Sequence, residues 1–130
     1  MNKLFCYERV EPHNKSVALI VDDGESIRSL IAEMLADAGF EVLAFQTAEA
    51  ALASAPSANP ALVLTDLRLG KNRMTGAELL REIALILPGT QGILMSAAFD
   101  PEMMPSYRFP LLAKPFSRTD LLNLISPPAA

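Results

Sequence analysis

Five short apolar runs alternate along the chain with longer segments that mix apolar and charged residues. The runs cover residues 16–21, 40–45, 61–65, 91–95 and 111–113. Runs of this length that are rich in Val, Ile and Leu predict β-strands, and a strand that is apolar at consecutive positions is usually buried on both faces. The chain is therefore expected to form a sheet with other elements packed on each side.

The segments that follow the first two runs predict helices. The segment 25–39 carries an apolar stripe with the spacing i, i+3, i+4, i+7 and i+8, formed by Ile27, Leu30, Ile31, Met34 and Leu35. This stripe predicts a helix that buries one face and ends at Gly39. After the second run, Thr47 is expected to cap an alanine-rich helix that Pro56 and Pro60 end.

Two further helices complete the predicted pattern. One is expected over residues 76–87, with an inner face formed by Leu79, Leu80, Ile83 and Leu87. The last begins at Ser117, which forms an approximate capping box with Asp120, and ends before Pro127-Pro128. Strands that alternate with helices predict an α/β fold, here a doubly wound, five-stranded parallel sheet with helices on both faces.

Polar side chains stand where the predicted strands end. In sheets of this kind the functional groups gather at the carboxyl ends of the strands, which all lie at one edge. The residues at those ends are Asp22, Asp23, Asp66, Ser96 and Lys114. The fold would therefore bring three carboxylates, one hydroxyl and one ammonium group together.

This combination of groups suits phosphoryl chemistry. Three neighbouring carboxylates repel each other and need a compensating cation, and oxygen ligands with room for water suit Mg²⁺. A carboxylate beside Mg²⁺ can attack an activated phosphoryl group and become an aspartyl phosphate. The metal and Lys114 would stabilise charge on the transferring oxygens, while Ser96 could hydrogen-bond one of them.

Composition narrows the class of protein. The chain has 130 residues, 51% of them hydrophobic, and a net charge of −4 from 11 basic and 15 acidic residues. These values fit one folded domain and argue against a nucleic-acid binder. A single cysteine, Cys6, excludes an internal disulfide framework, and no apolar span suits a membrane helix or a secretory signal. We expect a cytoplasmic protein with a polar lead-in at 1–15, a folded domain at 16–125 and a tail at 126–130.

Four motifs stand at the predicted strand ends: VDDGES, LVLTDLRL, ILMSAA and LLAKPF. With these motifs the sequence resembles the receiver domain of two-component response regulators, from about Ser16 to Ile125. The resemblance implies a flavodoxin-like sheet with the strand order 2-1-3-4-5. It also implies a signalling module that catalyses only its own phosphorylation and dephosphorylation, rather than an enzyme acting on other substrates.

The resemblance assigns roles to the acidic residues. Asp66 corresponds to the phosphoacceptor. Asp23 and Asp66 correspond to direct Mg²⁺ ligands, with the backbone carbonyl of Arg68 as a third ligand and Asp22 helping through water. Mg²⁺ is the cofactor that follows from this assignment.

It also assigns roles to two residues at the later strand ends. Ser96 corresponds to the switch Ser/Thr, and Lys114 to the phosphate-contacting lysine, with a cis Lys114-Pro115 bond. The implied partners are a histidine kinase or a histidine phosphotransfer protein, and an unknown downstream protein. Neither nucleic acid nor membrane is expected to bind this domain.

The loop after Asp66 departs from the family pattern. Met74-Thr75-Gly76 places its glycine about two residues further from the phosphoacceptor than is usual. The loop carries three basic residues, Arg68, Lys71 and Arg73. They form either a basic rim that steers an acidic partner or an ordinary solvated loop.

A second departure lies between Ser96 and Lys114, a stretch about four residues shorter than is common in the family. It contains Pro101, Pro105 and Pro110 and predicts a helix of one or two turns, or none. The family's aromatic residue three positions before the lysine is here Leu111. We therefore expect an atypical output surface. Two nearby aromatic residues, Tyr107 and Phe109, are out of register.

The sequence leaves three alternative functions to compare. An aspartate-nucleophile phosphatase would show Asp-x-Asp at the first strand end, where this chain has adjacent aspartates. A flavin-binding electron carrier would need a phosphate loop rich in glycine and hydroxyl residues after the first strand, and this sequence has no such loop there. A pseudo-receiver, which binds a partner without phosphorylation, is the main alternative because the fourth-helix region is short.

Overall fold

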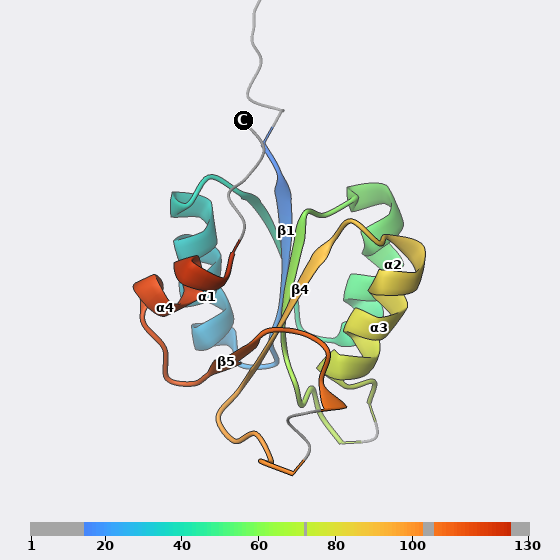
Figure 1. The fold of residues 1–130 in the computed structure, drawn as a ribbon. Coiled ribbons are helices and arrows are strands. Elements are labelled where there is room, and N and C mark those ends of the chain that lie inside the picture. The colour runs from blue at the N-terminus through green and yellow to red at the C-terminus, as the bar shows by residue number, and fades with distance from the viewer. Residues whose placement is uncertain (1–14, 72, 103–105, 126–130) are drawn as a thin grey trace, which may run out of the picture.

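The computed structural model describes residues 15–71, 73–102 and 106–125. Five parallel strands form one sheet with the order β2-β1-β3-β4-β5, which confirms the predicted fold class and strand order (Figure 1). The strands are β1 (Val17–Val21), β2 (Glu41–Phe45), β3 (Leu62–Asp66), β4 (Gln91–Ser96) and β5 (Leu111–Ala113). Each predicted strand agrees with the observed one to within one residue at either end. The predicted lead-in before Lys15 and the predicted tail lie outside the described residues.

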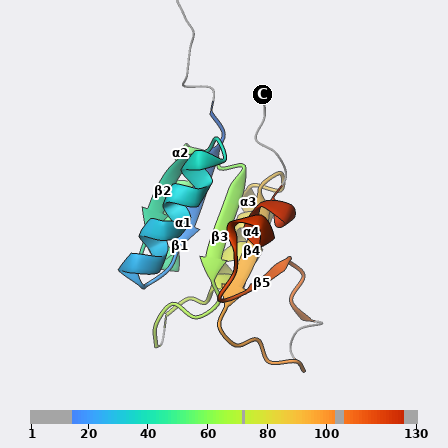
Figure 2. The ribbon, with the colours of Figure 1, turned by 90° about the vertical axis from the view of Figure 1, so that its left-hand side faces the viewer.

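Four helices cover the two faces of this sheet among the described residues. Helices α1 (Glu25–Asp37) and α4 (Arg118–Leu124) lie on one face, and α2 (Ala48–Ala58) and α3 (Gly76–Ile86) lie on the other (Figures 1 and 2). Thr75 and Ser117 begin α3 and α4 with complete capping boxes. These reciprocal hydrogen bonds satisfy backbone donors that the first helical turn leaves free.

The apolar core has two parts, one on each side of the sheet. Along β1, Leu19 and Val21 pack toward α2 and α3, whereas Ala18 and Ile20 pack toward α1 and α4. All four side chains are fully buried. This explains why the strand is apolar at consecutive positions, since a sheet covered on both sides offers no solvated face.

The alanine-rich helix α2 ends before Pro60, as predicted, but Pro56 does not end it. It continues through Pro56 to Ala58, and Asn59 then takes a left-handed conformation with φ 48°. Proline removes a single backbone donor here, close to the carboxyl end. Ala48, Ala51 and Ala55 are fully buried against the sheet, and this packing outweighs the local preference of proline.

The apolar stripe of α1 is only partly buried, which corrects the predicted packing. Ile31 and Leu35 lie in the core, but Ile27 and Leu30 are 40% and 50% exposed. The helix packs against the sheet through one edge of the stripe. The other edge lies near Phe116, beside the β5–α4 loop.

The segment between β4 and β5 contains no α-helix in its described residues, 97–102 and 106–110. Three prolines within ten positions explain this, because each removes a backbone donor that a helix would need. The rings of Phe99 and Tyr107 meet edge to face, with centroids 5.9 Å apart, and pack against the core beside α3. Among the described residues, none of the helices is long and apolar enough to span a membrane.

Candidate functional site

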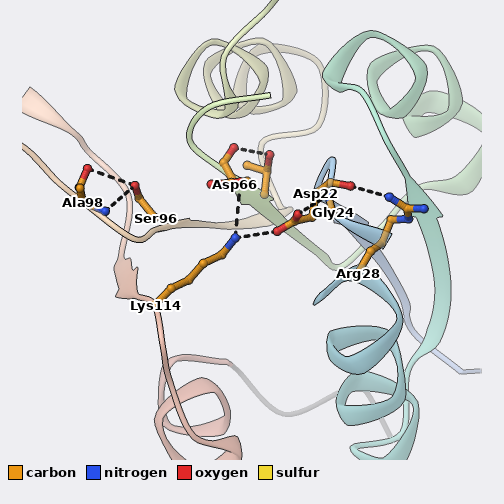
Figure 3. A network of polar contacts seen from close by, with 8 residues as sticks. Asp22, Gly24, Arg28, Asp66, Ser96, Ala98 and Lys114 are labelled. Atoms are coloured by element: carbon orange, nitrogen blue, oxygen red, sulfur yellow. Dashed lines mark hydrogen bonds and ion pairs between the residues drawn. The ribbon is translucent and has the colours of Figure 1, made fainter. Parts of the chain in front are cut away.

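The predicted polar residues meet at one edge of the sheet. Strand register places Thr65 beside Val21, Met95 beside Asp66, and Ala113 beside Ser96. The residues at or just beyond these positions therefore converge (Figure 3). They are Asp22, Asp66, Ser96 and Lys114, which the figure labels, and Asp23, which the figure does not label.

Lys114 connects two of the carboxylates. Its ammonium nitrogen Nζ lies 2.8 Å from Oδ2 of Asp22 and 3.4 Å from Oδ2 of Asp66. The backbone holds it in place, because Lys114 N–H donates to the Ser96 carbonyl across 2.8 Å. The Lys114-Pro115 peptide is cis, as the resemblance implied. Burial alone would lower the pKa of Lys114, but the hydrogen bond to Asp22 and the charge of Asp66 outweigh burial and raise it.

Asp22 is the buried anchor of the site, with 2% of its surface exposed. Its Oδ1 accepts a hydrogen bond from Gly24 N–H at 2.8 Å, while Oδ2 faces Lys114. Its backbone carbonyl accepts from Nη1 of Arg28, also at 2.8 Å, and its N–H donates to Phe45 O. These contacts fix both the carboxylate and the backbone, which compensates for the loss of water around a buried charge.

Asp66 lies at the end of β3 with 15% of its side chain exposed. Burial raises the pKa of its carboxyl above the ordinary value, and the charges of Asp22 and Asp23 act in the same direction. The Lys114 ammonium opposes this shift without cancelling it. An anionic Asp66 is thus destabilised by its neighbours, so an added cation would relieve the repulsion.

The three carboxylates form a group that fits a divalent cation. One oxygen from each of Asp22, Asp23 and Asp66 lies within 4.8 Å of the other two. Asp23 is exposed at the open side of the group. Carboxylate oxygens with access to water are the donors that Mg²⁺ prefers, so the residues present fit this metal. Arg68, whose carbonyl the resemblance named as a ligand, lies two residues beyond Asp66 with its side chain exposed.

Ser96 is the last residue of β4, at the predicted position, but its hydroxyl faces the loop that follows the strand. Its Oγ donates to the Ala98 carbonyl and accepts from Ala98 N–H, both at 3.1 Å (Figure 3). The residue is 5% exposed. The sequence predicted the position of Ser96 but not this pairing, because a hydroxyl chooses its partner from the local loop geometry.

Three supporting contacts were not predicted from the sequence. Arg28 holds the Asp22 carbonyl from the second turn of α1. Glu49, in the first turn of α2, accepts a hydrogen bond from Met74 N–H at 3.1 Å and so attaches the long loop to that helix. Gly76 packs directly on Asp66, since a Cβ there would lie 2.1 Å from the Asp66 carbonyl oxygen. Of the three, only Gly76 had a signal in the sequence, the Met-x-Gly pattern.

The sequence of this chain matches a known family over most of its length. The sequence model described as the response regulator receiver domain matches residues 18–126. The chain therefore belongs to the response regulator receiver domain family, the signalling modules of two-component systems.

Individual relatives agree with this assignment. The chain is 36% identical over 110 residues to the transcriptional regulatory protein FixJ of Rhizobium meliloti, covering 82% of this chain and 53% of FixJ. It is 31% identical over 115 residues to the DNA-binding transcriptional regulator NtrC of Salmonella typhimurium, covering 85% of this chain and 24% of NtrC. The chain thus spans about half the length of FixJ and less of NtrC.

Solved structures show the same fold. Chemotaxis protein CheY4 of Vibrio cholerae superimposes with a TM-score of 0.74 at 28% identity, covering 84% of this chain and 94% of CheY4. A CheY-like receiver domain from Methanospirillum hungatei gives the same TM-score and identity, with 84% and 89% covered.

Proposed function

We propose that this chain is a Mg²⁺-dependent phosphoacceptor that takes a phosphoryl group on Asp66 from a histidine kinase or a histidine phosphotransfer protein. The observation that carries the proposal is the convergence of Asp22, Asp23, Asp66 and Lys114 at one sheet edge. Such a group of charges has no evident use in stabilising the fold, because three neighbouring carboxylates face one ammonium.

In the proposed transfer, a carboxylate oxygen of Asp66 attacks the phosphorus of a phosphohistidine. The new O–P bond forms as the P–N bond breaks, and the electron pair returns to the imidazole nitrogen, which then takes a proton. Lys114 supplies positive charge next to Asp66 for the phosphoryl oxygens. Asp22 holds Lys114 in that position through the 2.8 Å ion pair.

Asp22, Asp23 and Asp66 would hold the metal, with the Arg68 carbonyl proposed as a further ligand on the strength of the family resemblance. Bound Mg²⁺ neutralises negative charge on the acidic group and on the phosphoryl oxygens. Asp23 is the exposed member of the three and leaves the site open to a partner's phosphohistidine.

Ser96 is proposed to contact a phosphoryl oxygen after transfer. To do so it must release the Ala98 carbonyl, to which its hydroxyl now donates. The Ala98 N–H would lose its acceptor in the same step. Phosphorylation is therefore coupled to a rearrangement at the start of the loop that leads to Phe99.

Acetyl phosphate with Mg²⁺ tests the proposal directly, read out by intact mass. We expect the wild-type chain to gain one acid-labile phosphoryl group, and Asp66→Asn to gain none. Chelation of Mg²⁺ should abolish the adduct. Asp100→Asn, which alters an exposed aspartate in the β4–β5 segment, serves as the control and should be labelled like the wild type. An equal adduct in Asp66→Asn would contradict the proposal by placing the phosphoryl group on another residue. No adduct in the wild type would contradict it and favour a pseudo-receiver.

The downstream partner is proposed to be a protein. The acidic charge of the chain disfavours direct binding to nucleic acid. FixJ and NtrC are named as transcriptional regulators, and the chain matches only part of each. A regulatory activity of that kind is therefore not assigned to this domain.

A further inference from the structure

The segment between β4 and β5, which forms no α-helix in its described residues, borders a groove beside α3. Two adjoining hollows of about 440 and 370 Å³ share Ala77, Arg81, Ser106 and Tyr107 in their walls. We call this surface the α3 groove. One wall is α3, and the opposite wall is the segment at 106–109, which lies next to α3 in the ribbon (Figure 1).

The floor and one side of the α3 groove are apolar. Ala77 is 6% exposed, and Tyr107 and Phe109 pack against the core beneath α3. Leu85, on the same helix, is 78% exposed at the edge of the groove. An aliphatic side chain this exposed next to partly buried aromatic rings is a typical feature of an interaction surface.

The rim of the α3 groove is basic. Arg68, Arg81 and Arg108 are exposed, and within the described part of the chain none of their guanidinium groups has a hydrogen bond or an ion pair. The acidic residue of the rim, Glu78, is engaged in the α3 capping box, where it accepts from Thr75 N–H at 2.9 Å. Three guanidinium groups without a partner side chain make this surface positively charged in a chain of net charge −4. Charge complementarity therefore favours an acidic partner.

We propose that the α3 groove binds an acidic amphipathic helix of a partner protein. Such a helix would place apolar side chains against Leu85, Tyr107 and Phe109 and carboxylates against the arginine rim. It would continue the layer of helices that α2 and α3 form on this face of the sheet. The peptide test does not require a phosphorylated Asp66, because the residues it varies, Arg81, Arg108 and Leu85, lie outside the proposed phosphorylation site.

A synthetic helical peptide with leucines on one face and glutamates on the other tests this proposal. We expect it to shift the backbone NMR signals of the residues that line the α3 groove. Arg81→Glu with Arg108→Glu should weaken binding at least tenfold, roughly the loss expected when charge complementarity is reversed. Leu85→Ala should weaken binding without changing its salt dependence. Lys15→Glu reverses a charge just before β1, outside the α3 groove, and should leave binding unchanged.

The same experiment contains the results that would overturn the proposal. A peptide with lysines in place of the glutamates should bind much more weakly. Equal binding of the two peptides would contradict the claim that the partner is acidic. Signal changes confined to Ile27 and Leu30 on α1 would place the interaction elsewhere. Self-association of the chain, detected by sedimentation and lost in Leu85→Ala, would show that the α3 groove binds a second copy of this chain. That result would overturn the proposed partner protein. Thermal melts of each variant establish that it is folded.

Discussion

The fold raises the pKa of one carboxyl group of the site, that of Asp66. Its side chain is mostly buried, and two other carboxylates lie close to it, so burial and repulsion together raise its pKa. Asp22, by contrast, has a partner for each carboxylate oxygen. The contact of Asp66 with Lys114 is 3.4 Å long, against 2.8 Å for Asp22, and this difference supports the proposal that Asp66 is the carboxylate that attacks phosphorus.

The raised pKa of Asp66 has a consequence for stability. Because the folded state binds this proton more tightly than the unfolded chain, the free energy of unfolding falls as pH rises above the ordinary pKa of the carboxyl. In Asp66→Asn, the side chain at position 66 is uncharged at any pH. Without Mg²⁺ we expect this variant to be more stable than the wild type at pH 7, with the difference lost as pH falls below that ordinary value.

Urea denaturation across this pH range provides the measurement. Glu33→Gln removes an exposed carboxylate of α1 outside the site and serves as the control. The account of Asp66 is wrong if both substitutions shift stability equally, or if Asp66→Asn is the less stable protein at pH 7.

At the scale of elements, the site depends on the close approach of β3 and α3. Gly76 begins α3 and touches the backbone of Asp66, while Gly76 N–H donates to Leu67 O across 2.8 Å. The loop between these contacts is held by Glu49 of α2. The carboxyl end of the longer loop is thereby attached both to α2, through Met74, and to the end of β3, through Gly76.

Gly76→Ala should disrupt this junction. Its Cβ would lie 2.1 Å from the Asp66 carbonyl oxygen, so β3 and α3 would have to separate. We expect a loss of about 3 kcal/mol in the free energy of unfolding, the upper range for overpacking. Gly89→Ala is the matched control, because a Cβ there meets no atom within 4 Å. Similar stability of the two variants in urea would contradict the proposed contact.

Much of the fold and the site residues could be predicted because both follow from the apolar runs. Asp22, Asp66, Ser96 and Lys114 come directly at strand ends, and parallel strands end at one edge. The exposure of Ile27 and Leu30 could not be predicted, since periodicity defines a helix face but not how far it tilts toward the sheet. The orientation of the Ser96 hydroxyl and the contact of Arg28 depend on side-chain geometry that no local pattern records.

At the scale of the whole molecule, the negative charge of the acidic group is expected to make stability depend on metal binding. Three carboxylates and one ammonium leave this edge of the sheet negatively charged. Any ligand that binds only the folded state stabilises it by mass action. The free energy of unfolding should therefore increase with the concentration of divalent cations, even without a phosphoryl donor.

Mg²⁺ should raise the melting temperature of the wild-type chain. At a concentration one hundred times its Kd, the gain in unfolding free energy is about 2.7 kcal/mol. Asp23→Asn, which removes the exposed carboxylate of the group, should strongly reduce this gain. Thermal melts with MgCl₂, compared with NaCl at equal ionic strength, provide the measurement. An unchanged response in Asp23→Asn would exclude this residue as a ligand.

The central claim is that Asp66 carries the phosphoryl group, and locating that group on the chain tests it most directly. After treatment with acetyl phosphate and Mg²⁺, borohydride reduces an aspartyl phosphate to homoserine, which peptide mass spectrometry can assign to one position. We predict homoserine at position 66 and unmodified aspartate at positions 22 and 23. Homoserine at either of the other two positions, or at none of the three, would contradict the account.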